Sequence, residues 1–414
     1  MRCSRSSASA SDAAGAGAYS ARVRRDDLGA DELAELERRG RRRGRRVLES
    51  PQGARIRLDG RDVISFSSNG YLGLANHPAL RAAAHAAIDR WGVGAGASRL
   101  IVGNSEAHEQ LEADVRAWLG RPAARIFGSG YAANTAVIAT LAGPDDVVFS
   151  DELNHASIID GCRLSRGRVR IFRHRDLGHL EAALREERGR RRIVVSETLF
   201  SMDGDVADVA GLVSLARAHD AITIVDDAHA VGAWGEGGRG LAGPDADVVV
   251  GTFGKALGVS GAFVAGGESV AELLWNRARS LVFSTAIPPM VAAAASAAVA
   301  IVQSAHGDAM RRNLFERIRG AGLGDRQIAP VLVGDDARAM QCTGRLLDEG
   351  LFVQGIRPPT VPDGTARLRV SITAAHAPED IERLRGALDR LATEGLVQQR
   401  FDHRQNQFRV TARR

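Results

Sequence analysis

The chain has 414 residues, 44% hydrophobic and 25% charged, which are ordinary proportions for a globular protein with a large core and a smaller second domain. Its net charge of +5 leaves an anionic partner open, and its three widely spaced cysteines argue against a disulfide framework and for a reducing, cytoplasmic compartment. The longest apolar run, residues 291–302, is shorter than the roughly 20 residues of a membrane span, so we expect a buried helix there.

The N-terminal residues lack the pattern of a folded core. Residues 1–20 are rich in Ser, Ala and Gly without an apolar period, which predicts a disordered extension. Residues 21–60 are expected to form a helical arm, with a polar helix over 31–46 that ends in the arginine-rich run 38–46. Such a run is usually a solvated surface, although it also fits a phosphate-bearing ligand or nucleic acid.

Residues 61–300 alternate between apolar strands and helical patterns. Compact β-branched runs predict strands at 192–196, 221–225 and 248–250, and helical spacing over 208–219 joins the first two. This β-α-β order predicts a large α/β domain with a mostly parallel sheet and helices on both faces.

Residues 301–395 predict a smaller C-terminal α/β domain. Its elements are a strand near Pro330, a helix over 338–349, a strand over 367–373 and a last helix that begins at Pro378. Residues 396–414 form a polar tail in which we assign no element.

One residue type is almost absent from the chain. Of its 55 basic residues, 54 are arginine and one is lysine, Lys255. An arginine stays protonated and is a poor nucleophile, whereas a lysine amine can lose its proton and condense with a carbonyl. Lys255 is therefore a candidate for covalent chemistry, the alternative being a chance survivor of an arginine-rich composition.

Polar residues follow two strands of the predicted sheet. The strand 221–225 leads into Asp226 and His229, and the strand 248–250 leads into Lys255. Ligands of parallel α/β sheets gather at the carboxyl ends of the strands. Pyridoxal phosphate needs a lysine for its aldehyde and a carboxylate beside its ring nitrogen, which Lys255 and Asp226 supply. His229 can bind the phenolic oxygen, although a turn-capping acid and a structural histidine also fit the pattern.

A phosphate group would need backbone N–H groups at a helix start, together with hydroxyls. The glycine-rich stretch 128–131 opens the helical run 132–141, and Ser201 and Thr252 supply hydroxyls near strand ends. The glycines of 92–96 lack the third glycine and the preceding strand of a dinucleotide-binding fingerprint. The sequence contains neither a Gly-x-Ser-x-Gly elbow nor a clustered Cys/His metal set.

The strand 367–373 alternates between arginine and apolar residues. Arg367 and Arg369 point to one face, and Leu368 and Val370 point to the other. Two arginines on one face fit bidentate binding of a carboxylate, although a solvent-facing strand has the same pattern.

Together these segments resemble the α-oxoamine synthase family of fold type I pyridoxal-phosphate enzymes. The match extends over about residues 35–390 and implies a seven-stranded, mostly parallel sheet, a smaller C-terminal domain and a homodimer with active sites at the interface. The segments that carry it are 67–74 (SSNGYLGL), 154–157 (NHAS), 200–205 (FSMDGD), 226–229 (DDAH) and 252–255 (TFGK).

The resemblance also implies a role for each matching residue. Lys255 would bind the cofactor covalently and, with His155 stacked on the ring and Asp226 at its nitrogen, carry the catalysis. The remaining cofactor contacts would be His229 at the ring oxygen, Gly130, Tyr131, Ser201 and Thr252 around the ring or its phosphate, and Ser284 and Thr285 reaching the neighbouring subunit's phosphate. Arg369 would bind the carboxylate of the amino acid, and Arg45 and Thr360 would contact substrate.

Within the family, the segment 356–369 most resembles members that join L-alanine to a pimeloyl thioester, on CoA or on acyl carrier protein, in biotin biosynthesis. The alternatives are members that use glycine with acetyl-CoA, of the 2-amino-3-ketobutyrate CoA ligase type, or serine with palmitoyl-CoA. A nucleic-acid-binding protein led by the run 38–46 leaves the strand-end residues unexplained, so we expect neither nucleic acid nor a membrane as partner. Two positions depart from the family: Gly70, often Asp, and Ala230, often Gly.

Overall fold

The computed structural model describes residues 28–402 and 407–410, in two compact units, Met1–Arg45 and Arg46–Arg414. The disorder predicted for residues 1–20 lies outside the described residues. In the first unit, helix α1 (Ala30–Arg38) has acidic residues in its first turn and Arg38 in its last, which complements the helix dipole. The prediction of a helix as far as residue 46 is wrong, because Gly40 adopts a left-handed conformation (φ 62°) just after the helix, and glycine accepts it without steric cost.

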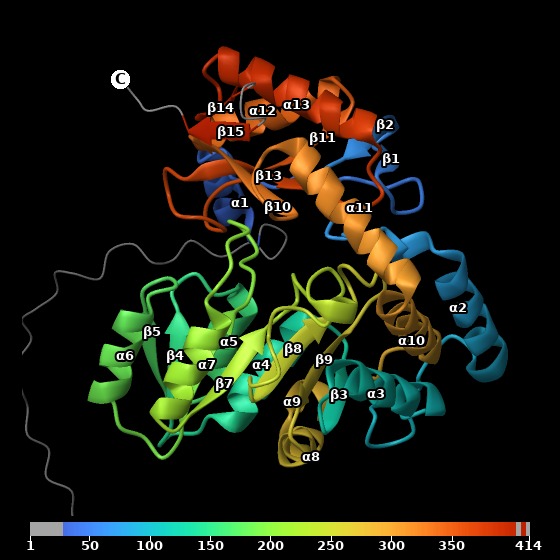
Figure 1. Ribbon diagram of the computed structural model, residues 1–414, viewed down its shortest axis with the longest axis vertical. Coiled ribbons are helices and arrows are strands. Elements are labelled where there is room, and N and C mark those ends of the chain that lie inside the picture. The colour runs from blue at the N-terminus through green and yellow to red at the C-terminus, as the bar shows by residue number, and fades with distance from the viewer. Residues whose placement is uncertain (1–27, 403–406, 411–414) are drawn as a thin grey trace, which may run out of the picture. The chain divides into compact units, whose positions relative to one another are not determined.

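A seven-stranded sheet lies at the centre of the second unit, in the order β3-β9-β8-β7-β6-β4-β5 (Figure 1). Strand β9 runs antiparallel to both of its neighbours and the other neighbouring pairs are parallel, which confirms the predicted sheet. The central strands are buried on both faces, and this explains why they read as continuous apolar runs. The strands are β3 (Ala123–Phe127), β4 (Val147–Asp151), β5 (Arg168–Phe172), β6 (Arg192–Glu197), β7 (Ala221–Asp226), β8 (Val248–Thr252) and β9 (Ala262–Gly266).

Helices cover both faces of this sheet because successive strand residues point to opposite sides. On one face Val148 and Val250 belong to a buried cluster with α4 (Gly130–Leu141), α5 (Ala156–Leu164), α8 (Glu268–Arg277) and α9 (Arg279–Val282). On the other face Val147 and Val249 pack with α6 (Leu177–Glu186) and α7 (Val209–Ala218). The expected helix over 208–219 is α7, whose N-cap Asp208 accepts a hydrogen bond from the Gly211 amide.

The apolar run 291–302 lies in helix α10 (Pro289–Gln303), which is largely buried as expected. It packs against α2 (Pro78–Trp91) and α3 (Glu106–Leu119) and is followed by α11 (Ala305–Ala321). No single helix in the described part of the chain is long and apolar enough to cross a membrane. Helices α10 and α11 reach that length and hydropathy only as a pair bent by 75°.

Two smaller sheets accompany the central one. Their strands are β10 (Ile328–Gly334), β12 (Gln354–Ile356) and β13 (Ala366–Ser371) in one, and β1 (Arg55–Leu58), β2 (Arg61–Ser65) and β11 (Leu351–Phe352) in the other. Helices α12 (Asp336–Asp348) and α13 (Pro378–Thr393) and the one-turn helices η2 (Leu74–Asn76) and η3 (Glu236–Gly238) complete the unit. The expected C-terminal strands and helices are present, and the domain boundaries near residues 60, 300 and 395 remain predictions.

The polar tail contains an element that the sequence did not predict. Strands β14 (Gln399–Asp402) and β15 (Gln407–Val410) pair as an antiparallel hairpin. Strands of four residues are too short to give a periodic hydrophobic signal within polar surroundings, so the pattern was missed.

Candidate active site

The carboxyl ends of three neighbouring strands bring the predicted residues together. Glu197 ends β6, Asp226 ends β7 and Thr252 ends β8, and Glu197 and Asp226 are register partners on adjacent strands. Lys255 follows β8 by three residues, so that its amine is within electrostatic reach of both carboxyl groups. The expected crevice at this edge of the sheet is therefore present.

Lys255 lies in an environment that favours its uncharged form. Burial lowers the pKa of its amine to about 8, and the nearby Arg369 charge lowers it further, against the raising effects of Asp226 and Glu197. The side chain nevertheless keeps some exposed surface, so a ligand can reach the amine. A substantial fraction of Lys255 is thus a free nucleophile near neutral pH.

Asp226 is held by two hydrogen bonds. Its Oδ2 accepts one from Asn134 Nδ2 at 2.6 Å, and its Oδ1 accepts one from the Ala228 amide at 2.9 Å. Donors of this kind favour the ionised carboxylate. The arrangement suits a carboxylate that must remain charged beside a protonated ring nitrogen.

His229 is buried behind this pair. Its Nδ1 lies 2.7 Å from the Tyr71 hydroxyl, and its carbonyl accepts a hydrogen bond from Gln327 Nε2 at 2.7 Å. Burial, followed by the charges of Lys255 and Arg369, lowers the pKa of His229 well below its usual value. The ring is therefore neutral, and Nε2 is the nitrogen left to face a ligand.

His155 precedes helix α5, where its Nδ1 accepts a hydrogen bond from the Ser157 amide at 3.2 Å. Asn134 Nδ2, which holds Asp226, also donates to Ser157 Oγ at 3.0 Å, and this oxygen lies 2.8 Å from His155 Nδ1. Burial of the ring lowers the pKa of His155, outweighing the attraction of Asp226. One asparagine thus positions both predicted partners of the cofactor ring.

The start of helix α4 forms the expected phosphate cradle. A Cβ on Gly130 would lie 3.9 Å from Thr252 Cβ, so the helix start and the end of β8 adjoin. The Thr252 hydroxyl donates to the Gly261 carbonyl at 2.9 Å, and Tyr131, 46% exposed, bonds through its hydroxyl to Asp160. The free amides of a twelve-residue helix favour an anion at this position.

Arg367 and Arg369 are 5% and 7% exposed, so the solvent-facing alternative for this strand is wrong. Arg369 donates to the Ser201 carbonyl at 2.7 Å and to Asn69 Oδ1 at 3.2 Å, and its charge acts on Lys255. Arg367 instead forms an ion pair with Asp203. Arg369 is therefore the arginine placed to meet a substrate carboxylate, whereas Arg367 fastens the loop that carries Ser201.

The other predicted residues are not gathered at this crevice. Thr360 is exposed in the segment between β12 and β13, and Ser284 and Thr285 are exposed between α9 and α10. Arg45 belongs to the unit Met1–Arg45, which is described by itself. The roles of these four residues remain predictions.

The crevice fits pyridoxal phosphate by its own geometry. It combines a lysine of lowered pKa, a held carboxylate and a helix start, and Glu197 Oε1 and Asn134 Oδ1 are buried without a hydrogen-bond partner within the described residues. A family model for aminotransferase class I and II matches residues 61–388. An 8-amino-7-oxononanoate synthase of Geobacter sulfurreducens is 48% identical over 89% of this chain and 99% of its own length. The chain belongs to the 8-amino-7-oxononanoate synthase family.

Solved structures place this family member in fold type I. Serine palmitoyltransferase from S. paucimobilis, solved with pyridoxal phosphate, has a TM-score of 0.83 at 31% identity, covering 89% of this chain and 98% of that one. An 8-amino-7-oxononanoate synthase from Francisella tularensis has a TM-score of 0.69 at 27% identity, covering 80% and 98%.

At the departure Gly70, a Cβ would lie 3.2 Å from Ser68 Oγ, which accepts a hydrogen bond from the Gly70 amide. A side chain at this position therefore requires a small shift of Ser68. Ala230, the other departure, is fully buried, so its methyl group is accommodated within the core.

Sequence reasoning missed three residues of this family site: Glu197, Asn134 and Tyr71. Glu197 directly follows the predicted strand 192–196, so the strand-end criterion that found Asp226 would have found it as well. Asn134 and Tyr71 gave no comparable signal, because their contacts with Asp226 and His229 span 92 and 158 positions of the chain.

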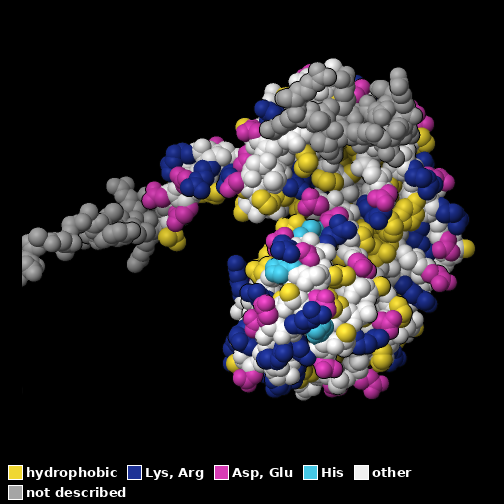
Figure 2. Space-filling view, turned by 60° about the vertical axis from the view of Figure 1, so that its left-hand side comes forward, with side chains coloured by type: hydrophobic (Ala, Val, Ile, Leu, Met, Phe, Trp, Pro, Cys, Tyr) yellow, Lys and Arg dark blue, Asp and Glu magenta, His cyan; other side chains and the backbone are white. Residues whose placement is uncertain are grey.

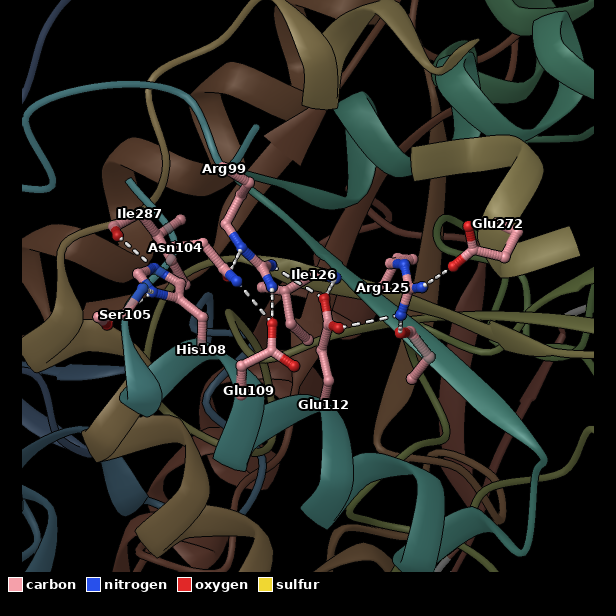
Figure 3. A network of polar contacts seen from close by, with 11 residues as sticks. Arg99, Asn104, Ser105, His108, Glu109, Glu112, Arg125, Ile126, Glu272 and Ile287 are labelled. Atoms are coloured by element: carbon pink, nitrogen blue, oxygen red, sulfur yellow. Dashed lines mark hydrogen bonds and ion pairs between the residues drawn. The ribbon is translucent and has the colours of Figure 1, made fainter. Parts of the chain in front are cut away.

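A buried ionic network supports the segment that carries Ser284 and Thr285 (Figure 3). Glu112 accepts hydrogen bonds from Arg99 at 2.9 Å and from Arg125 at 3.1 Å. On the same helix, α3, His108 Nε2 lies 2.8 Å from the Ile287 carbonyl. The Ala286 amide donates to the Ala97 carbonyl, two residues before Arg99, at 3.0 Å. The network therefore fixes the backbone that flanks both hydroxyls.

Proposed function

We propose that this chain condenses L-alanine with a pimeloyl thioester, carried by CoA or by acyl carrier protein, to give 8-amino-7-oxononanoate, CO₂ and the free thiol carrier in biotin biosynthesis. The observation that carries the proposal is the single lysine of the chain, Lys255, beside Asp226 at the carboxyl edge of the sheet. The identity of 48% over most of the chain to an 8-amino-7-oxononanoate synthase supports the choice of reaction.

Pyridoxal phosphate, when bound, supplies a conjugated ring that accepts the electron pair left at the alanine Cα. Lys255 would hold its aldehyde, Asp226 its ring nitrogen and His229 its ring oxygen, while His155 covers the ring face. The start of α4 with Gly130, Tyr131, Ser201 and Thr252 would hold the phosphate side, and Ser284 and Thr285 that of a second subunit.

Substrate binding falls to the arginines of this proposal. Arg369, buried and already paired with the Ser201 carbonyl, would hold the alanine carboxylate in a fixed orientation. Arg45 and Thr360 would contact the acyl substrate. Because Arg369 also lowers the pKa of Lys255, a bound carboxylate that neutralises its charge changes the basicity of the catalytic amine.

Proton transfer falls to Lys255. Once released from the aldehyde, its amine would accept the Cα proton of alanine, and Cα would then bond to the thioester carbonyl carbon while the thiolate leaves. The carboxylate departs as CO₂, and the Lys255 ammonium returns a proton to the same carbon. A pKa of about 8 suits an amine that must accept and return a proton near neutral pH.

A second candidate within the same fold is condensation of serine or glycine with another acyl-CoA, because the serine palmitoyltransferase structure superposes with a TM-score of 0.83. Purified holoenzyme should be assayed with alanine, glycine and serine against pimeloyl, acetyl and palmitoyl thioesters on CoA, and against pimeloyl-acyl carrier protein. The proposal predicts the highest kcat/KM for alanine with a pimeloyl thioester. Faster turnover of glycine or serine would replace it.

The nucleic-acid alternative finds little support in the described residues. Glu35 forms ion pairs with Arg38 and Arg39, and Glu37 pairs with Arg42, so part of the arginine run is neutralised within its own unit. On the face shown in Figure 2, basic and acidic side chains are interspersed over the second unit. The homodimer and the cytoplasmic location belong to the proposal as well.

A further inference from the structure

A buried chain of hydrogen bonds connects the histidine of the site with its arginine. The Tyr71 hydroxyl lies 2.7 Å from His229 Nδ1 and 3.1 Å from Asn69 Oδ1. The same Asn69 oxygen accepts a hydrogen bond from Arg369 at 3.2 Å. Tyr71 is fully buried, so no water competes for its hydroxyl. Its position leaves it one donor to divide between two acceptors.

The protonation states of the two rings make that division matter. Burial raises the pKa of Tyr71 to about 12, against the effect of Arg369, so the hydroxyl keeps its hydrogen over the working range. The pKa of His229 is lowered by burial and by the charged or titratable groups around it, Lys255, Arg369 and His155. A neutral imidazole carries a single N–H, and the hydrogen bond at one nitrogen decides whether the other donates or accepts.

The two arrangements have opposite consequences at His229. If Tyr71 donates to Nδ1, the imidazole proton resides on Nε2, which then donates toward the site. If Tyr71 donates to Asn69, Nδ1–H must donate to the tyrosine oxygen, and Nε2 becomes an acceptor. The 2.7 Å distance to His229, shorter than the 3.1 Å distance to Asn69, favours the first arrangement.

We propose that Tyr71 is a positioning residue whose hydroxyl sets the tautomer of His229 and links it to the Asn69–Arg369 pair that receives the substrate carboxylate. The inference rests on the proposed function, in which His229 faces the cofactor ring oxygen. Tyr71 touches neither cofactor nor substrate in this account. It acts through His229 on one side and through Asn69 on the other.

The test uses Tyr71→Phe, which removes the hydroxyl and keeps the buried ring. A donor at the ring oxygen stabilises its anionic form and so lowers the pH at which the visible band of the lysine-bound cofactor changes. Without Tyr71 to fix the donor tautomer, we expect this midpoint to rise by roughly one pH unit in the variant holoenzyme. The dissociation constant for alanine alone, read from the spectral change on titration, should rise roughly threefold to tenfold.

Asn69→Ala supplies the opposing variant, because it removes the competing acceptor and leaves Tyr71 only His229. It should weaken alanine binding while its spectral midpoint stays at or below that of the unaltered protein. Thr343→Val is the matched control, since it removes a buried hydroxyl that bonds only within α12, to the Ala339 carbonyl at 3.1 Å. It should leave both quantities unchanged.

An unchanged midpoint in Tyr71→Phe, or equal upward shifts in Tyr71→Phe and Asn69→Ala, would overturn the inference in favour of general loosening. If Tyr71→Phe does not fold, an upward shift in Asn69→Ala alone would also overturn it. Both readouts need only cofactor and alanine, so they stand apart from the choice of thioester. A protein that gives these shifts but no product with pimeloyl thioesters would refute the proposed reaction and leave the role of Tyr71 intact.

Discussion

Asn134 Nδ2 lies 2.6 Å from Asp226 Oδ2 and, on its other side, 3.0 Å from Ser157 Oγ. One amide group therefore holds the carboxylate that faces the cofactor ring nitrogen and the serine that orients His155. Helix α4, which carries Asn134, also supplies the phosphate cradle at its first residue. A single helix thus positions three sides of the proposed cofactor.

Asn134→Leu should weaken the enzyme without unfolding it. The substitution leaves Asp226 without one of its donors, and a hydrogen bond to a charged group contributes about 1.5–3 kcal/mol. We expect kcat to fall roughly tenfold to a hundredfold and the cofactor to dissociate more readily in dialysis. Thr135→Val, at the next position of α4, removes only a hydroxyl bonded to the Tyr131 carbonyl and should behave like the unaltered protein. Equal activity of the two variants would contradict the role of Asn134.

Capture of the cofactor by apoenzyme should depend on pH through Lys255. Below its pKa of about 8 the amine is protonated and cannot attack the aldehyde, so the capture rate should rise with pH up to about 8 and then level off. An unperturbed lysine would keep gaining rate toward its usual pKa of 10.5. Stopped-flow absorbance across this range distinguishes the two. Since Asp226 raises this pKa, Asp226→Asn should move the midpoint to lower pH.

The two arginines of β13 should separate in kinetics. Arg369→Gln removes the proposed carboxylate contact, and we expect KM for alanine to rise roughly tenfold to a hundredfold while KM for the thioester changes little. Arg367→Gln breaks the ion pair with Asp203 and leaves Arg369 in place, so its effect should fall mainly on thermal stability. A rise in KM for alanine that is larger in Arg367→Gln than in Arg369→Gln would reverse the assignment.

Glu197 should tolerate the loss of its charge. Burial, followed by the neighbouring Asp226 charge, raises the pKa of this carboxyl well above its usual value, so it carries a proton near neutral pH. Glu197→Gln keeps the shape of that neutral group, and we expect activity within about threefold of the unaltered protein. Glu197→Leu removes the polar atoms and should lose far more. If Gln were as damaging as Leu, the ionised carboxylate would be the working form.

The sequence predicted those parts of the fold that are encoded in short runs of the chain. The strands at 192–196, 221–225 and 248–250 were recognised because buried parallel strands are continuous apolar segments, and their ends located Asp226 and Lys255. The extent of α1 was overestimated, since a run of arginines carries no stop signal apart from Gly40.

Contacts between distant segments explain what was missed in the site. Tyr71 precedes η2 and meets His229 after β7, and Asn69 meets Arg369 of β13, 300 positions away. Such pairs depend on how the small sheets and the central sheet pack together, which no local period encodes. The resemblance to a known family supplied the segment 67–74, but it assigned no role to either residue.

The most direct test is to reduce the holoenzyme with borohydride, which makes the lysine–cofactor link permanent, and to measure the intact mass and locate the label. Because Lys255 is the only lysine in the chain, the account predicts one cofactor per chain, located on the peptide that contains Lys255, and none in Lys255→Ala. A label that persists in Lys255→Ala, or that maps to the N-terminal amine of the unaltered protein, would contradict it.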